Sequence, residues 1–133
     1  MDTRTKILSI EQALEAAAKV RGEGRVLRLA AGGFDVLQAA HARFLAGLRG
    51  DGDALVVAVY DDASLSRPVL AEEARAQLVA ALRAVDHVLI WPRSRIEELR
   101  EQLQAARVET VPDPARNIIE RSEERRVGKE CRL

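Results

Sequence analysis

The stretch ALVVAVY at residues 54–60 restricts the fold of this chain more than any other feature. It is a continuous apolar run, rich in valine, and it lacks the polar alternation of a strand with one face in water. Such a run is typical of a central strand in a parallel sheet whose two faces are both covered by helices. The run therefore predicts a covered parallel sheet, which requires helices between the strands.

Helix and strand signals do alternate along the rest of the chain. Shorter apolar runs predict strands at 25–31 and 87–91, and a weak final strand at 108–111. Helices are expected at 10–20, 37–48, 71–85 and 94–106, with a last helix starting near Pro114. The alternation predicts one α/β domain with right-handed crossover connections.

Capping boxes are expected to start two of these helices. Ser9 has Gln12 three residues later, and Ser94 has Glu97 at the same spacing. Gly22 and Gly24 are expected to end the first helix.

The composition excludes several classes of protein. The 133 residues include 21 Lys and Arg against 21 Asp and Glu, so the net charge gives no case for a nucleic-acid or anionic membrane partner. No apolar run reaches the roughly 18 residues of a membrane span, and MDTRTK lacks a signal core, so we expect a cytoplasmic protein. The single cysteine, Cys131, excludes an internal disulfide.

The C-terminal stretch RSEERRVGKEC at 121–131 is dense in charge and has no apolar periodicity. The same eleven residues are obtained by translating a common short-read sequencing adapter. We therefore expect a domain at 1–120 and an adapter-derived or disordered tail at 121–133, which is left out of the fold. A natural basic tail is the alternative.

Three stretches match motifs that occur together in one known family: LAAGGFDVLQAAH at 29–41, VAVYDDAS at 57–64 and RPVLAEEARAQLVAALRAVDHV at 67–88. KILSIEQAL at 6–14 and NIIE at 117–120 agree as well. On these residues the chain resembles the cytidylyltransferase-like nucleotidyltransferases, especially the bacterial heptose-phosphate adenylyltransferase domain and the glycerol-phosphate cytidylyltransferases.

The resemblance implies a three-layer α/β/α Rossmann-like sandwich with a parallel sheet of about four to five strands. It also implies a reaction in which a phosphorylated sugar or polyol attacks the α-phosphate of ATP or CTP and releases pyrophosphate. The transition state gathers negative charge, so the site must supply hydrogen-bond donors and positive charge. Mg²⁺ is the implied cofactor, bridging phosphates. No nucleic acid and no membrane are expected as partners, and a homodimer is left open.

The resemblance also assigns site residues. His41 matches the second of the family's two catalytic histidines, and Gln38 stands at the first. The glycine turn is expected to let backbone N–H groups approach phosphates at a helix N-terminus. The implied nucleotide-binding residues are Gly32, Gly33, Phe34, Asp35, Asp62 and Arg75, and no protein ligand to a metal is expected.

Ordinary structural roles are the alternatives at these positions. His41 alone would be a polar helix residue, and Asp62, next to Asp61, would be normal turn chemistry. Arg75 has nearby acidic partners in Glu72 and Glu73. His87 and Trp91, at the two ends of an expected strand, are expected to be structural, with core or dimer-interface packing for the tryptophan.

The sequence departs from the family pattern at the site itself. A neutral Gln38 replaces a histidine, and Ala40 replaces a glycine. The chain also lacks the polar pair before the turn, the lysine loop after Ser64 and the Ser-Thr-Thr near the end, where it has Ala30-Ala31, a short loop and Pro114-Ala115-Arg116. These losses predict a nucleotidyltransferase with impaired catalysis. A non-catalytic nucleotide-binding or scaffold pseudoenzyme, or a damaged gene fragment, are the alternatives.

Overall fold

The computed structural model describes residues 2–112, and its strands form one parallel sheet. The strands within that range are β1 (Leu27–Gly32), β2 (Ala54–Tyr60), β3 (His87–Trp91) and β4 (Val108–Thr110). They lie in the order β3-β2-β1-β4, and each neighbouring pair is parallel. The predicted α/β class is confirmed, with four strands in the described range.

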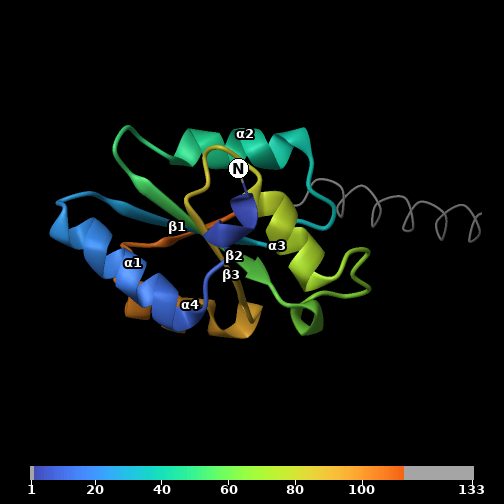
Figure 1. Cartoon of the computed structure of the whole chain (residues 1–133). Helices are drawn as coiled ribbons and strands as arrows, with labels where there is room; N and C mark the ends of the chain where they lie inside the picture. The colour runs from blue at the N-terminus through green and yellow to red at the C-terminus, as the bar shows by residue number, and fades with distance from the viewer. Residues whose placement is uncertain (1, 113–133) are drawn as a thin grey trace, which may run out of the picture.

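Helices cover both faces of this sheet (Figure 1). They are α1 (Ile10–Gly22), α2 (Ala39–Leu48), α3 (Glu72–Ala80) and α4 (Ile96–Leu103), with 3₁₀ turns η1 (Thr3–Lys6), η2 (Asp62–Ser64) and η3 (Arg93–Arg95). Side chains of α1 and α4 pack on one face, and those of α2 and α3 pack on the other. The result is the expected three-layer α/β/α sandwich.

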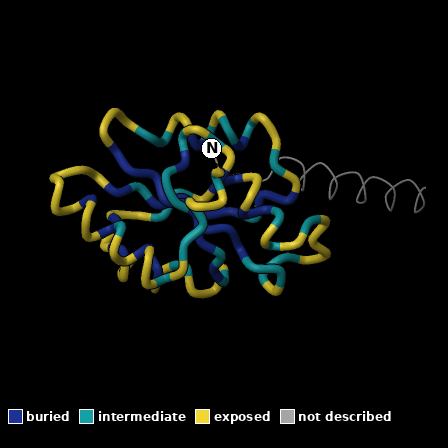
Figure 2. The backbone as a smooth tube through the Cα atoms, viewed as in Figure 1, coloured by how far each residue is buried: buried dark blue, intermediate teal, exposed yellow. Residues whose placement is uncertain are grey.

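The strand β2 shows why its sequence lacks polar alternation. All seven of its residues are buried, and the strands form the buried centre of Figure 2. Val56 faces the core of α1 and α4, whereas Val57 faces the core of α2 and α3. Successive side chains of a strand point to opposite faces, so a strand between two helical layers must be apolar at every position.

The first helix begins as its sequence predicts. The Ser9 hydroxyl accepts a hydrogen bond from the Gln12 backbone N–H at 3.2 Å, and the Gln12 side chain accepts one from the Ser9 N–H at 2.9 Å. This reciprocal pair is a complete capping box. Gly24 follows the end of α1 with a φ of +71°.

The second predicted capping box is wrong. Ser94 lies inside η3, and α4 begins one residue after Arg95, whose side chain does not cap the helix. Glu97 instead accepts a hydrogen bond from Arg100, and the Arg95 carbonyl accepts the Trp91 indole N–H at 2.8 Å. These contacts place a tight turn between β3 and α4. Likewise α4 ends at Leu103 rather than near Ala106.

The third helix is shorter than its apolar spacing predicts, because α3 ends at Ala80 rather than Val85. Asp86 exchanges two hydrogen bonds with Leu55 of β2: its N–H donates to the Leu55 carbonyl and its carboxylate accepts from the Leu55 N–H. The chain must leave the helix early to reach this strand. Lys6 donates to the Leu82 carbonyl in the resulting turn at 3.1 Å.

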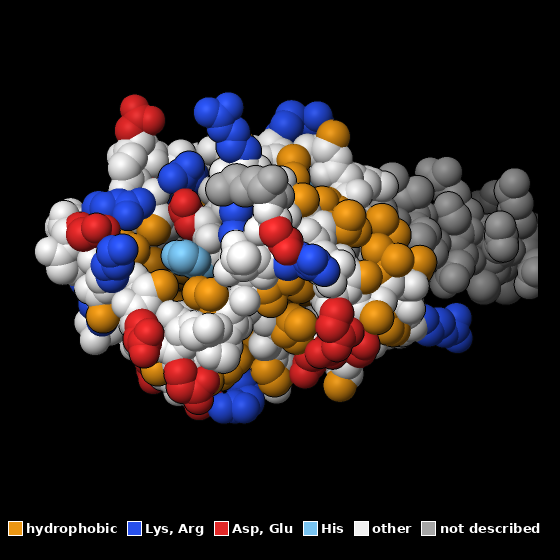
Figure 3. Space-filling model, in the orientation of Figure 1, with side chains coloured by type: hydrophobic (Ala, Val, Ile, Leu, Met, Phe, Trp, Pro, Cys, Tyr) orange, Lys and Arg blue, Asp and Glu red, His pale blue; other side chains and the backbone are white. Residues whose placement is uncertain are grey.

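The helix predicted near Pro114, the boundary at Glu120 and the tail at 121–133 lie outside the described residues. None of the helices at residues 2–112 has the length and apolar character that crossing a membrane requires. On the face seen in Figure 3, acidic and basic side chains are interspersed.

Candidate functional site

The order of the strands defines the edge where a ligand would bind. The chain passes from β1 to β2 and β3 on one side, and β4 then returns to the other side of β1. In open α/β sheets, ligands bind outside the carboxyl ends of the strands where the strand order reverses. That position lies between β1 and β4, and the glycine turn Gly32-Gly33 is located there at the end of β1.

Both glycines of this turn are tightly packed. A Cβ atom on Gly32 would lie 3.2 Å from the Phe34 ring and 3.3 Å from the Cβ of Val111. A Cβ atom on Gly33 would lie 3.1 Å from Leu65. The neighbouring side chains leave little room for a Cβ atom at either position. Both positions therefore favour glycine whether or not a ligand approaches their backbone.

Phe34 and His41 form the buried floor of the turn. Phe34 has a φ of +55° and is 1% exposed. Its ring meets the His41 ring edge-on, with the centroids 5.5 Å apart. His41 is also 1% exposed, and its Nδ1 atom accepts the Gln38 backbone N–H at 2.8 Å. This hydrogen bond fixes the first turn of α2.

Gln38 is the residue immediately before α2, and its side chain is exposed. The contact between Gln38 and His41 therefore uses a backbone group of Gln38. A direct role for either side chain at a phosphate stays a prediction. His41 is almost fully buried, whereas the Gln38 side chain is exposed.

Asp35 anchors the loop that follows β2. The residue is 3% exposed, and its carboxylate accepts hydrogen bonds from the backbone N–H groups of Val69 and Leu70 at 2.7 and 3.0 Å. Asp35 therefore holds in place the loop whose Leu65 side chain packs against Gly33. Asp35 supports the shape of the edge, and its contact with a nucleotide stays a prediction.

Arg75 connects the ends of two strands and the same loop. Its side chain is fully buried, and one guanidinium nitrogen donates both to the Gly33 carbonyl at 2.8 Å and to the Tyr60 carbonyl at 2.6 Å. Its other nitrogens donate to the Leu70 carbonyl at 3.0 Å and to the Asp62 carboxylate at 2.8 Å. The guanidinium thus joins β1, β2 and the loop after β2.

Asp62 is therefore the acidic partner of Arg75, in place of the adjacent Glu72 or Glu73. Glu72 of α3 accepts the Asp62 backbone N–H at 2.9 Å and so holds the backbone of Asp62 next to α3. The structure brings the predicted residues together at one edge, and it gives Arg75, Asp35 and Asp62 partners within the protein.

Sequence reasoning missed a cavity at the same edge, of about 450 Å³, lined by Ala63, Ser64, Arg93 and Ser94. It lies between the segments that follow β2 and β3. The signal was available, because Arg93 and Ser94 follow the carboxyl end of a predicted strand, as Asp61 and Asp62 do.

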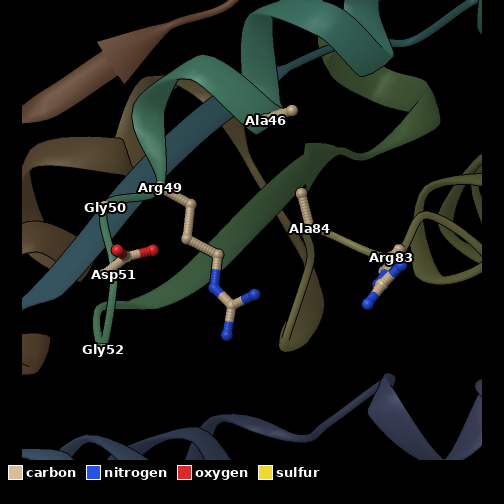
Figure 4. Close-up of a pocket in the computed structure, with 7 residues that line it drawn as sticks. All are labelled: Ala46, Arg49, Gly50, Asp51, Gly52, Arg83 and Ala84. Carbon is tan, nitrogen blue, oxygen red and sulfur yellow. The ribbon is translucent and has the colours of Figure 1, made fainter.

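A second cavity, of about 340 Å³, lies near the amino ends of β2 and β3 (Figure 4). Arg49 and Arg83 point into it from the end of α2 and from the turn after α3. Arg49 is already paired with Asp86 at 3.3 Å. This cavity lies at the edge formed by the amino ends of the strands, whereas the glycine turn lies at the opposite edge, at the carboxyl ends.

The two residues predicted to be structural differ in their surroundings. Trp91 packs in the core beside α1 and α4, and the Arg95 guanidinium lies 5.0 Å from its ring centroid. His87 at the start of β3 is partly buried, and burial lowers its pKa from the ordinary value, against a smaller opposing effect of Asp86.

The described residues offer no binding site of their own for Mg²⁺, since no three acidic, histidine or cysteine side chains gather there. The carboxylates of Asp35 and Asp62 at the edge already accept hydrogen bonds from backbone groups and from Arg75. These groups therefore do not fit a cation held by the protein, and none of them is assigned to the ion as a ligand.

The fold and this edge define a Rossmann-like α/β domain with a glycine turn at the carboxyl end of β1. Residues 29–127 match the family model described as cytidylyltransferase-like. The chain belongs to the cytidylyltransferase-like family.

Two relatives are bacterial proteins named "Bifunctional protein HldE". The one from Ectopseudomonas mendocina (strain ymp) is 38% identical over 104 residues, and the one from Pseudomonas entomophila (strain L48) is 36% identical over 104 residues. Each alignment covers 74% of this chain, which spans only 22% of the length of these relatives.

A solved structure shares the fold. The lipopolysaccharide core biosynthesis protein from Thermoplasma volcanium GSS1 aligns with a TM-score of 0.51 at 21% identity, covering 66% of this chain and 97% of that one.

Proposed function

We propose that this chain transfers a nucleotidyl group from ATP or CTP to a phosphorylated sugar or polyol, with weakened catalysis. The observation that carries the proposal is the glycine turn at the reversal of strand order, which the short segment 34–38 joins to the N-terminus of α2. The first turn of a helix leaves backbone N–H groups without helical partners, and its positive end favours phosphate. The family resemblance to HldE favours a sugar phosphate as the acceptor.

In this reaction a phosphate oxygen of the acceptor attacks the α-phosphorus of the triphosphate. The bond from the α-phosphorus to the bridging oxygen breaks, and pyrophosphate leaves. The chain contributes by holding both substrates in line and by donating hydrogen bonds to the charged phosphoryl oxygens. Mg²⁺ would accompany the triphosphate and reduce its charge. We place this reaction in the cytoplasm.

Two observations support weak catalysis. Gln38 is neutral where the family has a histidine, and the loss of one donor to a transition state costs on the order of 10²–10³ in rate. Arg75, the buried cation nearest the turn, already has four acceptors within the protein. Its charge is therefore used to organise the edge.

Nucleotide binding is tested first. Thermal unfolding is followed with ATP and with CTP, each with Mg²⁺, because a ligand present at 100 times its Kd adds about 2.7 kcal/mol to the stability. We expect one of the two nucleotides to raise the melting temperature. Failure of both at millimolar concentration contradicts the proposal.

Catalysis is tested by pyrophosphate release with sugar and polyol phosphates. We expect slow release that His41→Gln abolishes, whereas His87→Gln, at the other histidine of the chain, leaves it unchanged. The double substitution Gln38→His with Ala40→Gly restores the family pattern and is expected to raise the rate at least tenfold. No gain would contradict the view of a weakened site.

The second candidate function is that of a non-catalytic nucleotide-binding or scaffold protein. The burial of His41 and the internal partners of Arg75 favour it. Stabilisation by a nucleotide without pyrophosphate release, in the wild type and in the double variant, would support this candidate. A homodimer stays a prediction, and sedimentation of the full chain tests it.

A further inference from the structure

We infer that Arg93 binds the phosphate group of the acceptor, in the cavity between the ends of β2 and β3. This inference rests on the proposed transferase function and assigns the second substrate to its own place at the edge. The cavity of about 450 Å³ is lined by Ala63, Ser64, Arg93 and Ser94. The Arg93 guanidinium and the Ser94 hydroxyl at this cavity suit a phosphate, which accepts hydrogen bonds and carries negative charge.

The charge of Arg93 is available to a ligand, in contrast to that of its neighbours. Among residues 2–112, Arg93 has no carboxylate within ion-pair distance, whereas Arg95 pairs with Glu98 at 3.0 Å and Arg75 pairs with Asp62 at 2.8 Å. The guanidinium of Arg93 lies 5.7 Å from the centroid of the Tyr60 ring. This contact keeps the cation at the carboxyl end of β2 without neutralising it.

The backbone around Arg93 is fixed by the opposite wall of the cavity. The Ser64 hydroxyl accepts the Arg93 backbone N–H at 2.9 Å and donates to the Asp61 carboxylate at 2.5 Å. The segment after β3 is thereby joined to the segment after β2. Ser64 acts as a positioning residue, and Arg93 with the Ser94 hydroxyl supplies the donors for an anion.

The position of the cavity suits an acceptor better than a nucleotide. The glycine turn that would receive the triphosphate ends β1, beside the reversal of strand order, and the cavity lies on the other side, beyond β2. One nitrogen of Arg75 contacts both the Gly33 and the Tyr60 carbonyls, so the ends of β1 and β2 are adjacent. Neighbouring strands are about 4.8 Å apart, so the cavity lies roughly 7 Å from the end of β1, a separation that an extended triphosphate and an acceptor phosphate can bridge.

The test measures binding to the full chain by calorimetry, with and without a non-hydrolysable ATP or CTP analogue. The probes are glucose 1-phosphate, glycerol 3-phosphate and inorganic phosphate, with glucose and glycerol as unphosphorylated controls. We expect the phosphorylated probes to bind and the controls not to bind. Arg93→Ala is expected to weaken the phosphorylated probes at least tenfold, and Arg93→Lys is expected to recover part of this loss.

Arg95→Ala is the matched control, because it removes the same charge two residues away, where the arginine is already paired. It is expected to change the affinity less than twofold. Equal affinity of Arg93→Ala and wild type overturns the inference, as does the absence of binding to the wild type. Weaker binding of the nucleotide analogue alone, with unchanged acceptor binding, also overturns it by assigning Arg93 to the triphosphate.

The failure of this inference is distinguishable from failure of the proposed function. If nucleotides stabilise the wild type but Arg93→Ala leaves acceptor binding unchanged, only the acceptor site is wrong. If phosphorylated probes bind through Arg93 but neither ATP nor CTP stabilises the chain, the transferase proposal fails and a phosphate-binding cavity remains. Since Arg93 is exposed, the variants are expected to fold.

Discussion

At the scale of single residues, Arg75 is the clearest case of a charge that the fold uses internally. Its side chain is fully buried and donates to three carbonyl oxygens and one carboxylate. A buried guanidinium is tolerated only when its donors have partners, because removing a charge from water is costly. Its planar fork suits acceptors that come from different segments.

Replacing Arg75 tests this role. Arg75→Met keeps the apolar stem but leaves the carbonyls of Gly33 and Tyr60 without their donor, and we expect a loss of about 3 kcal/mol in the free energy of unfolding. Arg75→Lys is expected to recover part of it. Urea denaturation measures both, and Arg83→Met, at an exposed arginine, is the control. A variant Arg75→Met as stable as the wild type would refute the structural role.

His87 makes stability depend on pH. Burial lowers its pKa in the folded state, with Asp86 opposing and Lys6 and Arg25 adding to the decrease. The unfolded state therefore binds a proton first, so stability is complete above the ordinary histidine pKa of about 6.5 and falls as the pH decreases below it. His87→Gln is expected to flatten the stability profile below the ordinary histidine pKa of about 6.5. Denaturation at a series of pH values checks this, and an unchanged profile contradicts it.

At the scale of elements, the two predicted capping boxes had different outcomes. Ser9 and Gln12 form the reciprocal pair because the chain before α1 is extended there. Ser94 lies within η3, and the Arg95 carbonyl of that turn accepts the Trp91 indole N–H. A tertiary contact of the preceding strand therefore decided where α4 begins.

This difference predicts unequal effects of the same substitution. Ser9→Ala is expected to cost about 1 kcal/mol of stability, because the Gln12 N–H loses its acceptor. Ser94→Ala is expected to cost nearly nothing, because Ser94 does not cap a helix. Thermal and urea unfolding measure both variants. Equal losses would show that Ser94 caps α4 in solution.

At the scale of the whole molecule, one sheet carries two apolar cores. Leu99 of α4 belongs to the core on one face, and Leu45 of α2 belongs to the core on the other. Both cores contain alternate residues of the same strand β2. Because β2 contributes side chains to both cores, unfolding of one core disrupts the other. We therefore expect the domain to unfold in a single transition.

Truncating either core is expected to destabilise the whole domain. Leu99→Ala and Leu45→Ala each remove a fully buried side chain, and each should cost roughly 2–5 kcal/mol. Leu78→Ala is the matched control, since Leu78 is 40% exposed on α3 and should cost much less. Denaturant unfolding, monitored by Trp91 fluorescence and by circular dichroism, measures the stability of all three variants. Separate transitions by the two probes would contradict a single cooperative unit.

Much of the architecture could be predicted because it depends on local patterns. The spans of β2 and β3 agree with their apolar runs, and the covered parallel sheet follows from the unbroken run at 54–60. The C-terminal end of α3 and the start of α4 could not be predicted in the same way. They depend on where Asp86 meets Leu55 and where Trp91 meets Arg95.

The sequence by itself determined the order of helices and strands, the parallel class of the sheet and the family motif around the glycine turn. These follow from periodicity and from residue types within short segments. Only the tertiary structure decided what the site residues contact: Arg75 reaches Gly33 across 42 positions, and Asp35 reaches Val69 across 34. It also placed Arg93 beside Ser64, at a separation of 29. Such contacts depend on how distant segments meet at one edge of the sheet, and local sequence patterns do not encode that geometry.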